Sequence, residues 1–139
     1  MRIWGLTSSI LGVEFGMGEV TIGHDSVPEI LLVCRSQLDA YFRDKKQIFD
    51  LRLEPRGTPF QLKVWQELLR IPYGETRSYT DVARKIGNAQ AARAVGLANA
   101  RNPISIIIPC HRVLGKKGAL VGYGGELWRK QWLLDHERR

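Results

Sequence analysis

The sequence has few cysteines and no long hydrophobic run. Cys34 and Cys110 are its only cysteines among 139 residues, too few for the disulfide framework of small secreted domains. Its longest apolar stretch, 104–110, is interrupted by Ser105 and Pro109 and falls well short of the roughly 20 residues of a membrane span. The first residues do not combine a charged segment with an apolar one, as a signal peptide would. We therefore expect a cytoplasmic protein with reduced thiols and no membrane partner.

Acidic residues are scarce in the second half of the chain. Residues 1–55 carry 6 Lys and Arg against 8 Asp and Glu, a net charge of −2, whereas residues 56–139 carry 15 against 6, a net charge of +9. Between Arg77 and Lys117, eight cations accompany the single acid Asp81. A field this uneven attracts polyanions, of which nucleic acid is the usual one. The charge distribution is also compatible with a solvated basic face that only aids solubility.

The first part of the chain is predicted to mix strands with one helix. With 44% hydrophobic and 25% charged residues, the composition is that of a folded globular protein. Glycines divide residues 1–27 into short extended segments, apolar spacing predicts a helix over 28–42, and alternation predicts a strand over 48–53. The charge changes sign at 54–57, so we place a domain boundary between residues 1–55 and 56–139.

The second part is predicted to be mainly helical. Thr58, Pro59 and Gln61 are typical of a helix start with a capping box. Ser78 and Asp81 predict the start of a second, short helix. Residues 105–108 are expected to form a short buried strand, and residues 126–137 a last helix.

A turn at Gly87 and Asn88 joins the short helix to the next one. Asn88 is the expected N-cap of an alanine-rich helix over 89–100 that carries Arg93. Two short helices joined by a glycine-containing turn, the second of them small-surfaced and basic, are typical of a helix-turn-helix.

Cys110 is the candidate nucleophile. His111 follows it directly and cations surround it in the sequence, so we expect its thiol pKa to be lowered. Neighbours in an extended chain point to opposite faces, so His111 would reach the sulfur through a turn or a bridging water. Glu137 is the candidate that orients His111. Cys34, at a core position of a helix, is expected to be inert, and no metal site is predicted because the His and Cys spacing matches none.

An ordered series of motifs over about residues 56–137 resembles the O6-alkylguanine-DNA alkyltransferase family. The motifs are Gly57-Thr58-Pro59-Phe60, Val64-Trp65, Ile71-Pro72-Tyr73-Gly74-Glu75-Thr76, Ser78-Tyr79, Ala91-Ala92-Arg93-Ala94-Val95-Gly96, Asn102-Pro103-Ile104-Ser105-Ile106-Ile107-Ile108-Pro109-Cys110-His111-Arg112-Val113 and Trp132-Leu133-Leu134. The resemblance implies an α+β fold, with a mainly helical C-terminal domain whose helix-turn-helix enters the minor groove of double-stranded DNA. It also implies a small α/β N-terminal lobe, shorter here than in the family.

The resemblance implies a role for each matching residue. Cys110 would accept the alkyl group from O6 of a flipped guanine, with His111 acting as base through a water and Glu137 holding His111. Tyr79 would donate to N3 of the leaving base, and Arg93 would fill the vacated stack. The small residues Ala91, Ala92 and Gly96 would let the second helix approach the floor of the DNA groove. The base pocket would be formed by Val113, Tyr123, Gly124 and Asn102. The DNA phosphates would be bound by Arg84, Lys85, Arg101, Lys116 and Lys117. The carbonyls of Cys110 and Val113 would accept from the guanine amino group.

The predicted function is therefore DNA repair by alkyl transfer from O6 of guanine, and less well from O4 of thymine, to Cys110. A thioether has no evident route back to the thiol, so each molecule would act once, as a monomer and without a cofactor. A non-enzymatic alkyltransferase-like damage-binding protein is the main alternative, although such proteins replace the cysteine, commonly with tryptophan. A helix-turn-helix regulator with a structural Cys110 and a Cys-His hydrolase are the others.

Overall fold

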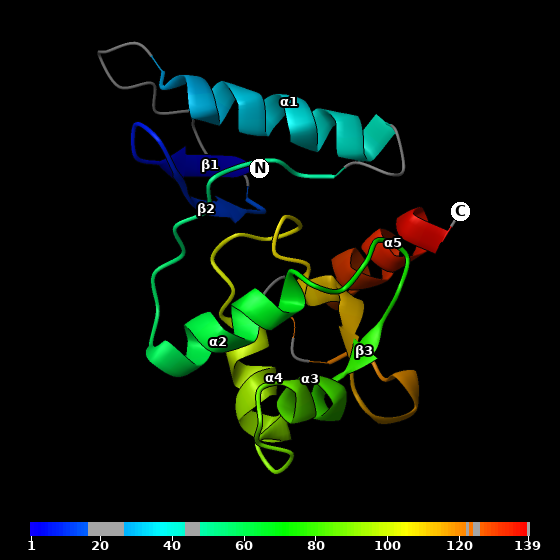
Figure 1. Ribbon diagram of the computed structural model, residues 1–139. Helices are drawn as coiled ribbons and strands as arrows, with labels where there is room; N and C mark the ends of the chain where they lie inside the picture. The colour runs from blue at the N-terminus through cyan, green and yellow to red at the C-terminus, as the bar shows by residue number, and fades with distance from the viewer. Residues whose placement is uncertain (17–26, 44–47, 122, 124–125, 139) are drawn as a thin grey trace. The chain divides into compact units, whose positions relative to one another are not determined.

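The computed structural model describes residues 1–16, 27–43, 48–121, 123 and 126–138. The chain divides into two compact units (Figure 1). The first unit holds Met1–Arg56 and Pro103–Ser105, and the second holds Gly57–Asn102 and Ile106–Arg139. Across the described residues the structure mixes α-helices with two small sheets, which confirms the predicted α+β class.

The first unit is a hairpin with one helix. Strands β1 (Arg2–Gly5) and β2 (Ile10–Glu14) pair antiparallel. Helix α1 (Glu29–Arg43) agrees with the helix predicted over 28–42 and buries Cys34, Leu38 and Tyr41. Burial raises the pKa of the Cys34 thiol to about 11, which agrees with its expected inertness.

The prediction of a strand over 48–53 is wrong. Only Leu53 pairs, through a single parallel bridge to Ile10 of β2, and Ile48 is 85% exposed. The side-chain amide of Gln37 satisfies both backbone groups of Asp50, because Nε2 donates to its carbonyl (3.2 Å) and its N–H donates to Oε1 (3.0 Å). A side chain on α1 thus takes the hydrogen bonds that a neighbouring strand would have made.

Helix α2 (Pro59–Leu68) opens the second unit and begins as predicted. Thr58 accepts from the Gln61 N–H and the Gln61 side chain accepts from the Thr58 N–H, so the capping box is complete. Val64, Trp65 and Leu68 form its buried face.

Strand β3 (Arg77–Ser78) leads into helix α3 (Tyr79–Lys85), and it pairs in parallel with β4 (Val113–Leu114). Ser78 and Asp81 cap the start of α3 as predicted, and they do so as a second capping box. Helix α4 (Ala92–Ala100) packs on both α2 and α3, and Figure 1 shows α3 and α4 side by side.

Helix α4 starts later than predicted. Its N-cap is Ala91, which makes no side-chain cap, whereas Asn88 accepts from the Gln90 N–H within a turn. Asn88 is therefore a turn residue and not the N-cap. Gly87 has a φ of 86°, so the turn residue does use the left-handed region open to glycine.

The strand predicted over 105–108 is also absent. Ile104 makes one bridge to Val13, and Ile106 then takes a φ of 72°, which ends the extended conformation. The chain continues as the one-turn 3₁₀ helix η1 (Cys110–Arg112).

Helix α5 (Leu127–Arg138) agrees with the last predicted helix. Leu133 and Leu134 are buried, whereas Leu127, Trp128 and Trp132 are exposed. Trp132 instead stacks on the ring of His136. None of the helices in the described ranges is long and apolar enough to cross a membrane.

Candidate active site

The Cys110 segment is held by two asparagines: Asn99 in the last turn of α4 and Asn102, two residues after the helix ends. The side chain of Cys110 is buried at the start of η1. Asn99 Nδ2 donates to the carbonyl of Cys110 (3.1 Å), and Asn102 Nδ2 donates to the carbonyl of Ile108 (2.8 Å). The structure thus brings both Asn99 and Asn102 to the Cys110 segment.

The thiol of Cys110 is less acidic than we expected. Burial raises its pKa, and this outweighs the opposing effects of a hydrogen bond with Asn102 and the positive charge of Lys130. The prediction of a lowered pKa was wrong because it considered the neighbouring charges and could not include the desolvation. At neutral pH the free protein therefore carries a thiol, and a base must take its proton when it reacts.

His111 and Glu137 meet inside the second unit. Nε2 of the fully buried His111 lies 2.7 Å from Oε1 of Glu137. A carboxylate only accepts, so Nε2 carries the proton and Nδ1 is the basic nitrogen. Nδ1 has no hydrogen-bond partner within the described part of the protein. Burial lowers the pKa of His111, against the opposing effect of Glu137, so the imidazole is neutral at pH 7 and can accept a proton.

Arg112 occupies the rest of the Glu137 carboxylate. Nε donates to Oε2 (2.9 Å) and Nη2 to Oε1 (2.8 Å), while Nη1 donates to the carbonyl of Ile71 (2.8 Å). Burial alone would raise the pKa of Glu137, but the hydrogen bonds from His111 and Arg112 hold it well below its usual range. Glu137 is therefore an anion shared by His111, Arg112 and the backbone N–H of Gly74, which donates to Oε2 (3.4 Å).

Lys130 is a second buried charge. Nζ donates to the carbonyls of Val113 (2.5 Å) and Val121 (2.8 Å) and lies 3.4 Å from the hydroxyl of Tyr79. The Tyr79 hydroxyl also donates to the carbonyl of Val121. Burial lowers the pKa of Lys130 to about 8 and raises that of Tyr79 to about 12. An ammonium thus stands beside the phenol expected to act on the leaving base.

The predicted base pocket is only partly described. Tyr123 is half-buried, and burial raises its pKa, while Gly124 lies outside the described residues. The carbonyl of Cys110 already accepts from Asn99 and from the N–H of Val113, so both of its lone pairs are used. The carbonyl of Val113 accepts from Lys130. A guanine amino group would meet a freer acceptor at Val113 than at Cys110.

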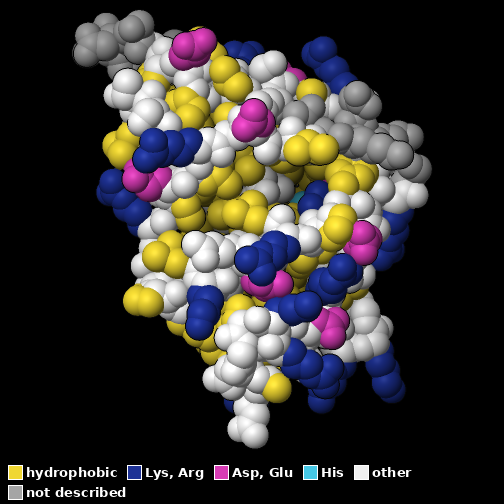
Figure 2. Space-filling view, viewed as in Figure 1, with side chains coloured by type: hydrophobic (Ala, Val, Ile, Leu, Met, Phe, Trp, Pro, Cys, Tyr) yellow, Lys and Arg dark blue, Asp and Glu magenta, His cyan; other side chains and the backbone are white. Residues whose placement is uncertain are grey.

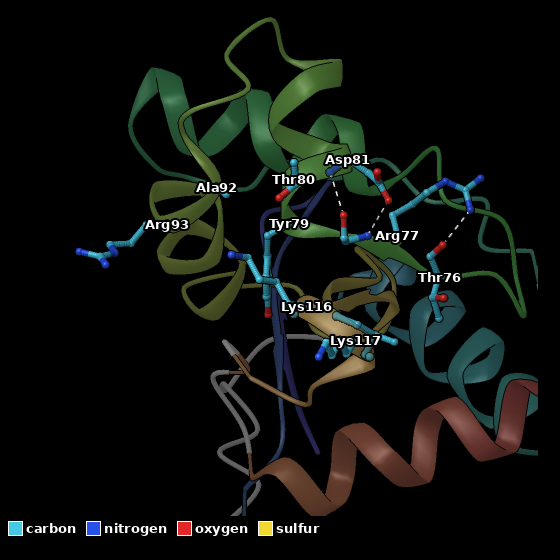
Figure 3. Close-up of a pocket in the computed structure, with 13 residues that line it drawn as sticks. Thr76, Arg77, Tyr79, Thr80, Asp81, Ala92, Arg93, Lys116 and Lys117 are labelled. Carbon is cyan, nitrogen blue, oxygen red and sulfur yellow. Dashed lines mark hydrogen bonds between the residues drawn. The ribbon is translucent and has the colours of Figure 1, made fainter.

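A basic pocket lies at the start of α3. It measures about 680 Å³ and is lined by Tyr79 and its neighbours, by Ala92 and Arg93 of α4, and by the loop Gly115–Gly118 (Figure 3). Lys116 and Lys117 lie on that loop, and Lys117 takes a left-handed φ of 56°. Figure 3 shows the Arg93 side chain extending away from the other labelled side chains. Cys110 is not among the residues that line this pocket.

The remaining residues predicted to contact DNA lie on or beside α3 and α4. Arg84, Lys85 and Arg101 are exposed, and Ala91 and Gly96 are half-buried on or beside α4. Figure 2 shows Lys and Arg side chains gathered in the lower half of the view, where Figure 1 places α3, with a few acidic side chains among them. Within the described ranges, no three His, Cys, Asp or Glu residues form a group that could hold a metal ion.

Three functional candidates were missed by the sequence prediction: Asn99, Arg112 and Lys130. Lys130 precedes Leu133, Leu134 and Glu137 by three, four and seven positions, which puts it on the buried stripe of α5. A lysine at a core position was therefore a detectable signal. Arg112 was counted only as one cation of the basic stretch, and nothing local distinguishes it from an exposed one.

Comparison with known proteins gives one consistent family. Residues 59–139 match the family described as 6-O-methylguanine DNA methyltransferase, DNA binding domain. The methylated-DNA–protein-cysteine methyltransferase of Mycobacterium leprae is 60% identical over 103 residues, which span 74% of this chain and 62% of that protein. The chain thus matches less than two thirds of the length of this curated relative.

Solved structures agree in fold. The crystal structure of Mycobacterium tuberculosis OGT in complex with DNA has a TM-score of 0.86 and 47% identity, covering 98% of this chain and 84% of that one. S. pombe Atl1, in complex with damaged DNA containing O6-carboxymethylguanine, has a TM-score of 0.52 and 30% identity over 59% of this chain and 78% of that one. With a family match over more than half of its residues, the chain belongs to the 6-O-methylguanine DNA methyltransferase family.

Proposed function

We propose that this protein repairs DNA by moving an alkyl group from O6 of guanine to Cys110, once per molecule. The observation that carries the proposal is the buried pair at the residue after Cys110, in which Glu137 fixes His111 with Nδ1 as its basic nitrogen. Such a pair can activate a thiol that burial keeps protonated. The family membership and the relatives' names support the same reaction.

The transfer is a single displacement. The proton of the Cys110 thiol passes to Nδ1 of His111, through a water, and the sulfur attacks the alkyl carbon. The S–C bond forms as the C–O6 bond breaks, and the electron pair of that bond stays with guanine. Guanine becomes neutral by taking a proton at N3 from Tyr79. The product is a thioether, so Cys110 is consumed and the same molecule cannot react again.

Lys130 supports the leaving-base step. When Tyr79 gives up its proton, negative charge develops on its oxygen, which lies 3.4 Å from Lys130 Nζ. A fixed ammonium in a buried site stabilises such charge more than water would. This arrangement offsets the raised pKa of Tyr79, which by itself opposes proton donation.

DNA binding is assigned to α3, α4 and the basic pocket. We propose that the two helices act as a helix-turn-helix on the minor groove of duplex DNA, as a monomer. Ala92 lines the pocket, and Ala91 and Gly96 add little bulk at the helix surface. Arg93, already extended outward, would replace the flipped guanine in the stack, while Lys116 and Lys117 bind phosphates. Such a protein would work with the DNA in the cytoplasm.

The mass of the protein tests the proposal. Incubation with a duplex containing O6-methylguanine should add one CH₂ to the protein, confined to the peptide that carries Cys110. The Cys110→Ala variant should bind the duplex and leave the lesion unrepaired. Cys34→Ala is the matched control and should react like the parent protein. An unchanged mass, or methylation on the Cys34 peptide, would contradict the assignment.

A damage-binding function without transfer is the second candidate. The fold similarity to Atl1 and the burial of Cys110 favour it. That function predicts tight, lesion-dependent binding with no change in mass. A regulator would bind modified and unmodified duplexes equally, and a hydrolase would turn over esters or peptides. A competition between the two duplexes, run beside the mass measurement, separates these cases.

A further inference from the structure

Arg112 and His111 are neighbours in the sequence and share one acceptor in space. Oε1 of Glu137 receives both Nε2 of His111 (2.7 Å) and Nη2 of Arg112 (2.8 Å), and Oε2 receives Nε of Arg112 (2.9 Å). The guanidinium is anchored at its other end on the carbonyl of Ile71 and lies over the ring of Tyr73. The three nitrogens of the guanidinium each donate a hydrogen bond, so the Arg112 side chain is held in one position.

We propose that Arg112 is a positioning residue for the alkyl transfer: it holds Glu137 as a shared carboxylate and so keeps His111 neutral and ready to accept the Cys110 proton. This inference rests on the proposed function. It assigns Arg112 a purpose distinct from binding DNA phosphates, for which a buried, paired guanidinium is unsuited.

The electrostatics of the buried pair give the reason. A carboxylate facing an imidazole alone favours a bound proton, either on the imidazole or between the two groups. A histidine that already carries a proton on both nitrogens cannot act as a base. Arginine stays charged throughout the accessible pH range, so its cation opposes that extra proton under all working conditions.

The other charged and titratable groups around His111 come from α5 and η1. Helix α5 contributes Glu137 and Lys130, and η1 contributes Cys110 and Arg112 itself. The charge of Lys130, like that of Arg112, lowers the pKa of His111. Its hydrogen bonds, however, go to Val113, Val121 and Tyr79 and not to Glu137. Arg112 contacts the carboxylate that His111 uses, through Nε and Nη2.

The test compares Arg112→Gln with Arg112→Lys, because glutamine removes the charge and lysine keeps it. Single-turnover transfer from an O6-methylguanine duplex is measured from pH 5 to 9. In Arg112→Gln we expect the acid limb of the pH–rate profile to move up by about one to two pH units, the effect of one nearby charge at an effective dielectric of about 20. Arg112→Lys should be slower at every pH but keep its acid limb within a few tenths of a unit of the parent.

A second measurement keeps the inference separate from the proposed function. The imidazole of His111 is titrated by NMR without DNA, and its signal is assigned with a His111→Asn variant. The parent imidazole should gain its proton at a pH below the ordinary range of histidine, and Arg112→Gln should gain it at a higher pH than the parent. A loss of rate that is uniform across pH in both variants, with an unchanged His111 titration, would overturn the inference.

If the parent fails to transfer the methyl group, the proposed function is wrong, while the NMR result still decides the role of Arg112. If Arg112→Gln does not fold, the inference is decided by Arg112→Lys, whose acid limb and His111 titration must both match the parent.

Discussion

The ammonium of Lys130 lies 3.4 Å from the hydroxyl of Tyr79, and both groups donate to the carbonyl of Val121. Lys130 is wholly buried, and all its donors are directed at oxygen. Burying a lysine costs free energy, which shows here as a pKa lowered to about 8. In the proposed reaction negative charge develops on the Tyr79 oxygen, and an ammonium held beside it would stabilise that charge.

Lys130→Met should therefore slow alkyl transfer. Methionine keeps the length of the side chain and removes its charge, so the phenolate that forms on Tyr79 loses its nearest cation. We expect the single-turnover rate on an O6-methylguanine duplex to fall by roughly 10²-fold, as when one donor to a developing anion is removed. Lys63→Met, at an exposed position of α2, removes the same charge far along the chain and should leave the rate unchanged. A variant that reacts at the parent rate would exclude Lys130 from the chemistry.

Tyr79→Phe should make the Lys130 charge irrelevant. Phenylalanine keeps the ring and removes the proton that guanine receives, so the rate should fall by a similar factor while DNA binding persists. If Lys130 acts through Tyr79, adding Lys130→Met to Tyr79→Phe should cost much less than Lys130→Met alone. The double-mutant cycle is measured from the four transfer rates. Independent, multiplying effects would show that Lys130 acts elsewhere, for example directly on Cys110.

Stability should fall as the pH drops below about 6.5, because of His111. Burial lowers the pKa of His111 in the folded protein below its ordinary value of 6.5. Between these two values the unfolded chain binds a proton that the folded one does not, so unfolding becomes easier by up to about 1.4 kcal/mol per pH unit. Urea titrations between pH 5 and 7.5 measure this slope. His111→Gln should lose it, and a parent protein with constant stability over that range would contradict a neutral, buried imidazole.

Local patterns in the sequence predicted those features that depend on near neighbours. Both capping boxes join residues three positions apart, so Thr58 with Gln61 and Ser78 with Asp81 could be identified by spacing alone. The strand over 48–53 failed because its hydrogen bonds are taken by Gln37, a side chain on another element. The strand over 105–108 failed because Ile106 adopts a left-handed φ that its residue type disfavours.

The same distinction holds at the site. The pairing of His111 with Glu137 was predicted from chemical roles, and the structure brings the two together. The acidity of Cys110 was not predictable, because neighbouring cations are visible in the sequence and burial is not. Arg112 was counted only as one cation of the basic stretch, since its partner lies 25 positions away. Lys130 could have been found, because its helix places a charge among leucines.

Lys116 and Lys117 should set part of the salt dependence of DNA binding. They line the basic pocket beside Arg93 and are exposed. Each phosphate contact contributes about 0.9 to the slope of log K against log salt for duplex DNA. Lys116→Ala with Lys117→Ala should therefore reduce that slope by just under 2, and weaken binding most at low salt. Arg35→Ala with Lys63→Ala, at exposed positions of α1 and α2, removes the same charge and should leave the slope nearly unchanged. Fluorescence anisotropy with a labelled duplex at a series of salt concentrations measures both slopes. Equal slopes for the two double variants would mean that the pocket attracts DNA only through net charge, and that its lysines touch no phosphate.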